Sequence, residues 1–242
     1  MINFSLVIPF YNEEKNIPFV IKSLKKILKK TSEVEFILIN NGSTDKSDKI
    51  FIKLLKNKKK KYFRNFKIKK NIGYGHGIKF GLKKSKGNYL AWTHADLQTD
   101  PADILKAINE KKKINNEKFF IKGKRKNRNP KEVFQTRAME IFSFIILNHR
   151  ITDINAQPKL ITKIFFKKYL SKLAPDDLSL DLYAYYLAAS KGYTIKEFNV
   201  LFKKRKYGET KGGGEGGSVF TKLKLIFVTL KCLIKLKFLK IK

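Results

Sequence analysis

A short acidic motif offers the most specific chemistry in this 242-residue chain. His94-Ala-Asp-Leu-Gln98 directly follows an apolar run that ends at Thr93, and Asp100 comes two residues later. Carboxylate and amide oxygens at a strand end bind hard cations such as Mg²⁺ or Mn²⁺, which neutralise a diphosphate leaving group. Asp96 is the central candidate ligand. The alternative is a plain turn in which Asp100, placed before Pro101, caps the next helix.

Two further polar segments have the composition of ligand-binding loops. Asn40-Asn-Gly-Ser-Thr-Asp45 could hydrogen-bond a base or ribose, or it could be a simple turn between a strand and a helix. Gly73, Gly75 and Gly77 are closely spaced, but they lack the order Gly-x-Gly-x-x-Gly and follow the third predicted strand. A dehydrogenase is therefore disfavoured, and so is a hydrolase, because no Ser-His-Asp or Cys-His arrangement has usable context.

Alternating strands and helices position these segments. Apolar runs rich in β-branched residues predict buried strands at 4–8, 35–39, 66–69 and 89–93. Three-four apolar spacing and capping residues predict the intervening helices, at 17–28, after 43–45 and at 78–84. Parallel strands with crossover helices bind ligands beyond the carboxyl ends of the strands. We therefore expect the loops 9–13, 40–45 and 94–101 to converge.

The second half of the chain is less regular. Its predicted elements are a helix at 104–113, a strand at 119–121, a basic loop at 122–131, a helix from Val133 to Ile146, a turn at 153–158, a helix around 178–190 and a strand near 193–200. Residues 203–217 are expected to form a mobile loop. The predicted domains are 1–217 and a basic helix, 218–242, which either lies in a membrane interface or packs on the first domain.

The composition restricts the partners that we expect. The net charge is +34, but only six of the 54 basic residues are arginine, and the lysines are spread along nearly every segment. This distribution favours solvated lysines, and a nucleic-acid- or membrane-surface-binding protein is the alternative. A single cysteine, Cys232, excludes an internal disulfide, and we find neither a signal-peptide pattern nor an apolar run of membrane-spanning length. We expect a cytoplasmic location.

Several motifs, taken in order, resemble the family 2 inverting glycosyltransferases. They are Leu6-Val-Ile-Pro-Phe-Tyr-Asn-Glu13, Ile39–Asp45, Asn71-Ile-Gly73 and Ala95-Asp-Leu-Gln98, followed by Asp153–Lys159, Leu180–Leu182 and Arg205–Lys211. Their spacing is similar to that of the dolichol-phosphate mannose synthases and related polyprenyl-phosphate sugar synthases. The resemblance covers about residues 3–211. It implies a Rossmann-like glycosyltransferase A fold, an α/β architecture with a mixed, mostly parallel sheet flanked by helices.

The resemblance also implies roles for individual residues. The nucleotide pocket would be lined by Pro9, Tyr11, Asn12, Glu13, Asn41 and Gly73. The divalent metal ion would be bound by His94, Asp96 and Gln98. His94 stands where the family has an aspartate, which leaves Mg²⁺ and Mn²⁺ both open as the cofactor.

Basic residues of the same resemblance would meet the phosphate groups. Arg205 and Lys211 match residues that do so from a mobile loop, and Arg125 and Arg137 would extend this basic wall. A cationic loop that closes on the diphosphate would stabilise the charge that develops on the leaving group.

The acceptor determines whether a general base is required. A sugar hydroxyl must lose a proton to a carboxylate, and Asp181 and Asp177 are the candidates, although Asp181 could instead only cap a helix. A polyprenyl phosphate, with a second pKa of about 6, attacks without a base. We expect inverting transfer of a hexose from a nucleotide diphosphate sugar to a polyprenyl phosphate, which we prefer, or to a surface glycan. The expected setting is peripheral, at the inner face of an anionic membrane, without nucleic acid.

Overall fold

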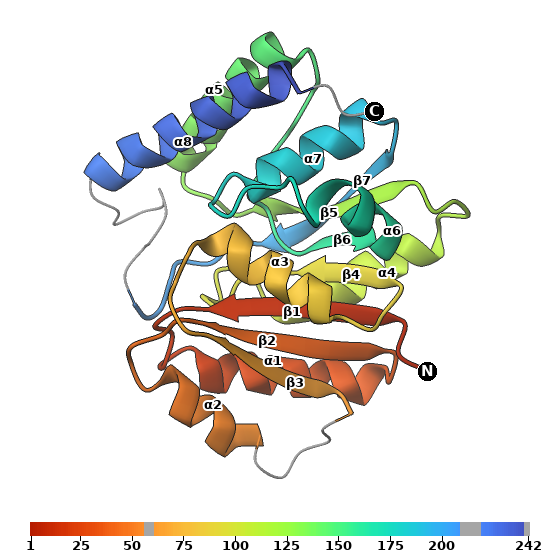
Figure 1. Ribbon diagram of the computed structural model, residues 1–242, viewed down its shortest axis with the longest axis vertical. Helices are drawn as coiled ribbons and strands as arrows, with labels where there is room; N and C mark the ends of the chain where they lie inside the picture. The colour runs from red at the N-terminus through yellow and green to blue at the C-terminus, as the bar shows by residue number, and fades with distance from the viewer. Residues whose placement is uncertain (56–60, 209–218, 240–242) are drawn as a thin grey trace.

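A single seven-stranded sheet forms the centre of the computed structural model, which describes residues 1–55, 61–208 and 219–239 (Figure 1). The strand order is β3-β2-β1-β4-β6-β5-β7. The strands are β1 (Phe4–Phe10), β2 (Val34–Asn41), β3 (Phe63–Ile68), β4 (Tyr89–Trp92), β5 (Phe119–Lys126), β6 (Lys159–Thr162) and β7 (Thr194–Leu201). Only β6 runs antiparallel to its neighbours. The expected mixed, mostly parallel sheet is confirmed.

Helices cover both faces of this sheet. They are α1 (Ile17–Lys30), α2 (Ser47–Leu55), α3 (Tyr74–Lys84), α4 (Ile104–Lys112), α5 (Pro130–Leu147), α6 (Lys163–Phe165), α7 (Leu180–Ser190) and α8 (Val219–Lys237), with short 3₁₀ and π turns at Pro101–Asp103 and Phe166–Leu170. Successive β1 side chains serve opposite faces, so that Val7 packs with α3 while Leu6 and Ile8 pack with α1 and α4. Burial on both faces explains the unbroken apolar runs of the inner strands.

The second half of the chain contains two departures from the sequence prediction. The predicted basic loop is wrong at its start, because Lys122–Lys126 continues β5. Lys122 is fully buried, and its ammonium group lies 3.0 Å from Glu197 on β7. The strand β6 was not predicted, since it is four residues long and begins with another fully buried lysine, Lys159. A short strand that begins with a buried, ion-paired lysine does not show the usual apolar pattern.

The helix α8 packs on the rest of the domain. Its Cys232, Leu233 and Leu236 are buried in the same core as α7, and it also contacts α5. The boundary between the predicted units 1–217 and 218–242 stays a prediction. Within the part of the chain that the structure describes, none of the helices combines the length and apolar character needed to cross a membrane.

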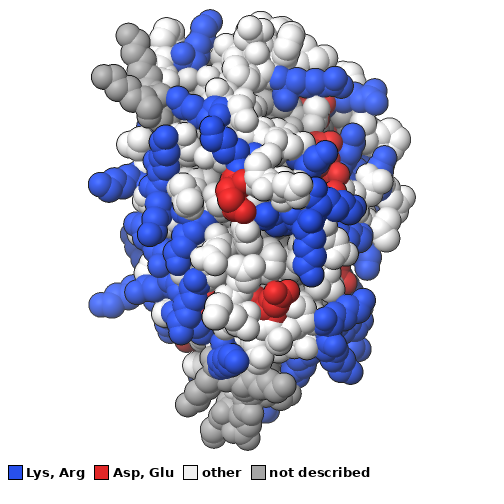
Figure 2. All heavy atoms as spheres, turned by 90° about the vertical axis from the view of Figure 1, so that its right-hand side faces the viewer, with Lys and Arg blue, Asp and Glu red and all other residues white. Residues whose placement is uncertain are grey.

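Basic side chains are scattered over the surface. Figure 2 shows one face of the molecule, on which lysines and arginines are separated by uncharged surface and by occasional acidic groups. A nucleic-acid-binding protein usually gathers such residues into one stripe or patch. On this face the basic side chains lie along both sides of the view, with uncharged surface and acidic groups between them, so charge alone does not identify a partner.

Candidate active site

The loop that follows β1 is joined to the loop that follows β2. Asn12 has a φ angle of 54°, a left-handed conformation that asparagine adopts more readily than most residues. Its side-chain oxygen accepts a hydrogen bond from Thr44 N at 2.8 Å, and its backbone N–H donates to Ser43 Oγ at 3.1 Å. The Glu13 amide donates to Ser47 Oγ at 2.9 Å. These contacts hold the carboxyl ends of β1 and β2 together at one edge of the sheet.

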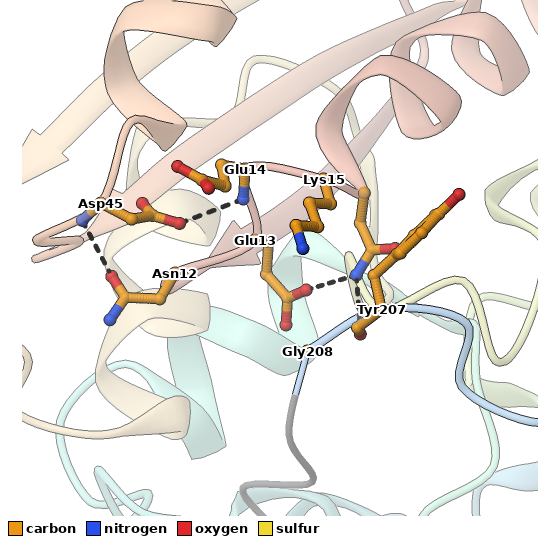
Figure 3. A pocket seen from close by; sticks show the side chains of 8 residues that line it. Asn12, Glu13, Glu14, Lys15, Asp45, Tyr207 and Gly208 are labelled. Carbon is orange, nitrogen blue, oxygen red and sulfur yellow. Dashed lines mark hydrogen bonds between the residues drawn. The ribbon is translucent and has the colours of Figure 1, made fainter.

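A pocket of about 190 Å³ opens between these loops and the segment that follows β7 (Figure 3). Its lining comes from Asn12, Glu13, Glu14, Lys15, Asn16, Asp45, Tyr207 and Gly208. Drug-sized ligands occupy pockets of roughly 300–1,000 Å³. The pocket is therefore smaller than a site that encloses a whole ligand of that size.

Arg205 connects this pocket to the acidic motif. Its guanidinium Nη2 lies 2.9 Å from Glu13 Oε1 and 3.5 Å from Asp96 Oδ2. The other Glu13 oxygen accepts a hydrogen bond from Asn16 Nδ2 at 2.6 Å. One arginine thus balances two poorly exposed carboxylates that come from different strand ends.

The acidic motif forms a tight turn after β4. Asp96 Oδ1 accepts a hydrogen bond from Gln98 N at 3.1 Å, and Asp96 Oδ2 lies 3.8 Å from His94 Nδ1. The Gln98 carbonyl accepts from Lys203 N at 2.8 Å, which ties the segment after β7 to the motif. The predicted convergence of the three loops is confirmed. Asp100 accepts from Ala102 N at 2.9 Å, so its capping role is also confirmed.

The glycines of 71–81 allow close packing of backbone against backbone. A Cβ atom on Gly73 would lie 2.3 Å from the Asp176 carbonyl oxygen, and one on Gly75 would lie 2.4 Å from the Pro175 carbonyl oxygen. The start of α3 can therefore lie directly on the segment that leads into α7. The Gly73 carbonyl also accepts a hydrogen bond from Asn41 Nδ2 at 3.0 Å, while Asn41 Oδ1 has no partner among the described residues.

Asp181 is the centre of a buried polar network. Asp181 is only 2% exposed. One oxygen accepts from Trp92 Nε1 at 2.9 Å, and the other accepts from Gln157 Nε2 at 2.9 Å and from the Tyr74 hydroxyl at 3.2 Å. Lys159 Nζ lies 3.2 Å from this second oxygen. Both oxygens of the carboxylate are therefore occupied.

Burial shifts the protonation of two members of this network. Loss of solvent lowers the pKa of Lys159 to about 8, although the attraction of Asp181 acts in the opposite direction. Burial and the charge of Asp181 raise the pKa of the Tyr74 hydroxyl well above its ordinary value. Tyr74 therefore stays neutral and keeps its single proton for donation at physiological pH.

Comparison with known proteins decides the family. The profile described as Glycosyl transferase family 2 matches residues 5–173. This match spans more than half of the sequence. The chain belongs to glycosyl transferase family 2.

Two curated relatives of this family 2 chain are named for lipid-phosphate substrates. The undecaprenyl-phosphate 4-deoxy-4-formamido-L-arabinose transferase of Photorhabdus laumondii subsp. laumondii is 28% identical over 143 residues, 59% of this chain and 42% of that protein. The dolichyl-phosphate beta-glucosyltransferase of Homo sapiens is 25% identical over 213 residues, 81% of this chain and 66% of that protein. The chain spans less than two thirds of either relative, and their names agree with the branch that the motifs resemble.

A solved structure with the same fold is the glucosyl-3-phosphoglycerate synthase of Mycobacterium tuberculosis, in complex with Mn²⁺, uridine diphosphate and phosphoglyceric acid. Its TM-score is 0.71 at 13% identity, over 99% of this chain and 80% of that chain. The mannosyltransferase PcManGT of Pyrobaculum calidifontis, in complex with GDP-Man and Mn²⁺, gives a TM-score of 0.63 at 14% identity, over 85% of this chain and 58% of that chain. These similarities confirm the glycosyltransferase A type of fold that the motifs implied.

The remaining predicted site residues differ in how deeply they are buried and in whether they are ion-paired. Pro9 is buried in β1, and Tyr11 follows that strand at the edge of the site. Arg125 is paired with Asp153 through Nε at 2.8 Å, which lowers the pKa of that carboxyl group despite its burial. Arg137 is exposed on α5.

Two further predicted residues complete the comparison. Asp177 is exposed and accepts a hydrogen bond from Ser179 N at 2.8 Å. Lys211 lies outside the described residues.

Sequence reasoning missed the residues that surround Asp181. Gln157 and Lys159 lie inside the motif Asp153–Lys159, and Tyr74 directly follows Asn71-Ile-Gly73, but their types alone gave no reason to select them. Lys159 and Trp92 are single residues at strand positions, and only the pairing of β4 with β6 brings them together, at opposing positions of the ladder. No local pattern in the sequence reports that contact.

Proposed function

We propose that this chain transfers a hexose, with inversion at the anomeric carbon, from a nucleotide diphosphate sugar to a polyprenyl phosphate. The nucleotide would lie along Pro9–Glu13, Asn41 and Gly73. His94, Asp96 and Gln98 would bind the divalent metal ion, Mg²⁺ or Mn²⁺, which withdraws charge from the diphosphate leaving group. The Mn²⁺ complexes of proteins with the same fold, one with the donor GDP-Man and one with uridine diphosphate, support a metal-dependent donor site in this chain.

The observation that favours a phosphate acceptor is the occupied carboxylate of Asp181. A sugar hydroxyl would need a base, and this carboxylate is buried, receives three hydrogen bonds and is paired with Lys159. Asp177, the other candidate base, is exposed and holds the turn before α7. A phosphate acceptor is already an anion near neutral pH and needs neither carboxylate.

Arg205 is suited to the developing charge of the leaving group. Its guanidinium is shared between Glu13 and Asp96, at 2.9 and 3.5 Å. Arginine donates to phosphate oxygens through a planar fork, so Arg205 would hold the diphosphate beside a metal ion bound at Asp96.

An exposed apolar face on α5 and α8 supports contact with a membrane. The two helices pack side by side (Figure 1). Their exposed large apolar side chains, with that of the residue after α8, are Phe134, Ile141, Phe142, Phe144, Ile145, Phe220, Leu223, Ile226, Phe227, Ile234 and Phe238. Monomeric soluble proteins rarely expose continuous apolar patches of this kind without a partner surface.

The order of residues along α8 supports an anionic lipid surface as that partner. At about 100° per residue, Phe220, Leu223, Phe227, Ile234 and Phe238 fall within about 60° of one another. The exposed lysines at 224, 231 and 235 fall within the next 60° or so. An apolar row with a bordering lysine row is typical of helices that lie in a membrane interface. The acceptor of the proposed reaction is embedded in such a surface.

Nucleotide diphosphate release tests the proposal directly. A panel of nucleotide sugars would be incubated with Mn²⁺ or Mg²⁺, and release would be measured with and without a short-chain polyprenyl phosphate. We expect one donor whose release increases with the lipid phosphate and is abolished by Asp96→Ala. Release that is unchanged by the lipid phosphate but increases with an oligosaccharide would contradict the proposal that the acceptor is a polyprenyl phosphate. Release that is the same in Asp96→Ala as in the wild type would contradict the assignment of Asp96 to the donor site.

A further inference from the structure

The hydroxyl group of Tyr74 joins the buried network to the acidic motif. Its oxygen lies 2.8 Å from His94 Nε2, 3.1 Å from Gln157 Nε2 and 3.2 Å from Asp181 Oδ2. The Tyr74 and His94 rings meet edge to face, with centroids 5.2 Å apart and an interplanar angle of 81°. A continuous path of hydrogen bonds therefore runs from Asp181 to the imidazole ring of a predicted metal ligand.

The chemistry of its partners fixes the direction of each hydrogen bond to Tyr74. Asp181 is paired with Lys159, so its carboxylate only accepts, and the single Tyr74 proton points to it. The Gln157 amide nitrogen lies 2.9 Å from the same carboxylate oxygen and can only donate. If this amide were rotated, its oxygen would face the carboxylate, so the nitrogen must be on this side.

Only one tautomer of the neutral His94 ring is then compatible with Tyr74. The hydroxyl proton is used by Asp181, so the Tyr74 oxygen can only accept from the imidazole. His94 Nε2 must therefore bear a hydrogen atom. In the neutral ring the lone pair consequently sits on Nδ1, the atom that lies 3.8 Å from Asp96 Oδ2.

We propose that Tyr74 and Asp181 are positioning residues that hold His94 as its Nε2–H tautomer, so that His94 Nδ1 and the Asp96 carboxylate bind one transition-metal ion together. Two ligands at about 2.1 Å from an octahedral ion lie roughly 3.0 Å apart, so a movement of less than about 1 Å would close this pair. The inference rests on the proposed donor site and names the metal preference of that site.

The donor set fits a metal ion that is completed by the substrate. Among the described residues there is no group of three or more His, Cys, Asp and Glu side chains that could hold a metal ion. With His94, Asp96 and Gln98 as ligands, the remaining coordination positions would be left for diphosphate oxygens and water. An imidazole ligand favours Mn²⁺ and later transition metals over Mg²⁺, which prefers oxygen ligands.

Loss of the Tyr74 hydroxyl should weaken metal binding, although it removes none of the metal ligands. Groups that orient a metal-bound histidine typically contribute 10–100-fold in affinity. We expect Tyr74→Phe to weaken Mn²⁺ binding about tenfold, measured from the free Mn²⁺ signal in electron paramagnetic resonance. Trp92→Phe is the matched control, because it also removes one hydrogen bond to Asp181 but does not reach His94. It should retain the wild-type Mn²⁺ affinity to within about twofold.

Nitrogen-15 NMR of the histidine rings gives a readout that needs neither metal nor activity. The chain has three histidines, so comparison with His94→Gln assigns the His94 signals. In the neutral ring we expect a protonated Nε2 in the wild type and a mixture of tautomers in Tyr74→Phe.

A protonated Nδ1 in the wild-type protein would overturn the inference, and so would equal Mn²⁺ affinities of wild type and Tyr74→Phe. These results would leave the proposed transfer reaction untouched. Conversely, the expected tautomer in a protein that releases no nucleotide from any donor would contradict only the proposed function.

Discussion

Replacement of Lys159 by methionine should destabilise the protein strongly, because it leaves Asp181 charged and buried. Removing one partner of a buried ion pair costs about 3–5 kcal/mol. Asp181 keeps three neutral donors, from Trp92, Gln157 and Tyr74. We therefore expect the lower end of this range, about 3 kcal/mol for Lys159→Met at pH 7.

Lys122→Met is the matched control for this change. Both lysines are fully buried, but the partner of Lys122 is Glu197, whose side chain is 23% exposed. Glu197 also lies 3.5 Å from Lys124 and accepts a hydrogen bond from Thr152. A carboxylate that is partly solvated and has a second cation nearby is destabilised little when one lysine is removed. We therefore expect Lys122→Met to cost about 1 kcal/mol of unfolding free energy.

Chemical unfolding measures both variants with a probe inside the network. Trp92 is the single tryptophan of the chain and donates to Asp181, so its fluorescence follows unfolding at this site. For a domain of this size, about 3 kcal/mol corresponds to a decrease in Tm of roughly 6–12 °C, against roughly 2–4 °C for the control. If Lys159→Met were as stable as the wild type, or no less stable than Lys122→Met, Asp181 could not be a buried charged centre.

Three other predictions concern the pKa of Lys159, the charge of Arg205 and the exposed apolar face of α8. Burial lowers the pKa of Lys159 from 10.5 to about 8, so the unfolded chain holds this proton more tightly. The difference in unfolding free energy between wild type and Lys159→Met should therefore increase as the pH rises from about 8 toward 10.5, and denaturant titrations that show a decrease over this window would contradict the assignment. Arg205→Ala should lower kcat/KM for the donor about 100-fold in steady-state assays, since one charged donor to the leaving group is lost, whereas the exposed neighbour Lys204→Ala should change it less than about threefold. Phe227→Ser should lower partitioning into anionic vesicles about tenfold in flotation assays, while Ile164→Ser, with 70% exposure against 68% for Phe227, should have no effect because Ile164 lies away from α5 and α8.

The alternating half of the fold could be predicted from the sequence because each element there follows one period. The strands β1 and β2 are buried throughout and mainly apolar, and α1 places Ile17, Val20, Ile21, Leu24 and Ile27 on one buried face. The rule that ligands gather at the carboxyl ends of parallel strands then predicted that the loops after these strands converge. The contacts among Asn12, Glu13 and the loop after β2 are the result.

The rest of the site depends on pairing that no local pattern reports. Lys159 and Trp92 meet because β6 runs antiparallel beside β4, and the burial of Lys159 is tolerated only because Asp181 lies 3.2 Å away. A lysine in a sequence indicates an exposed position by default. The contacts of Tyr74 were equally hidden, because its partners come from the loop after β4, the segment before β6, and α7.

Isolation of the product would test the central claim, that this site places a sugar on a lipid phosphate. The protein would be incubated with the donor identified by the release assay and with vesicles that contain a polyprenyl phosphate. We predict a lipid-extractable product whose sugar is released by mild acid, as expected for a glycosyl phosphate, and whose anomeric configuration in proton NMR is opposite to that of the donor. A product with retained configuration would contradict the inverting mechanism. A sugar found only on a glycan hydroxyl, or only as free hexose, would contradict the phosphate acceptor. It would also contradict the conclusion that Asp181 has a structural role and does not act as a general base.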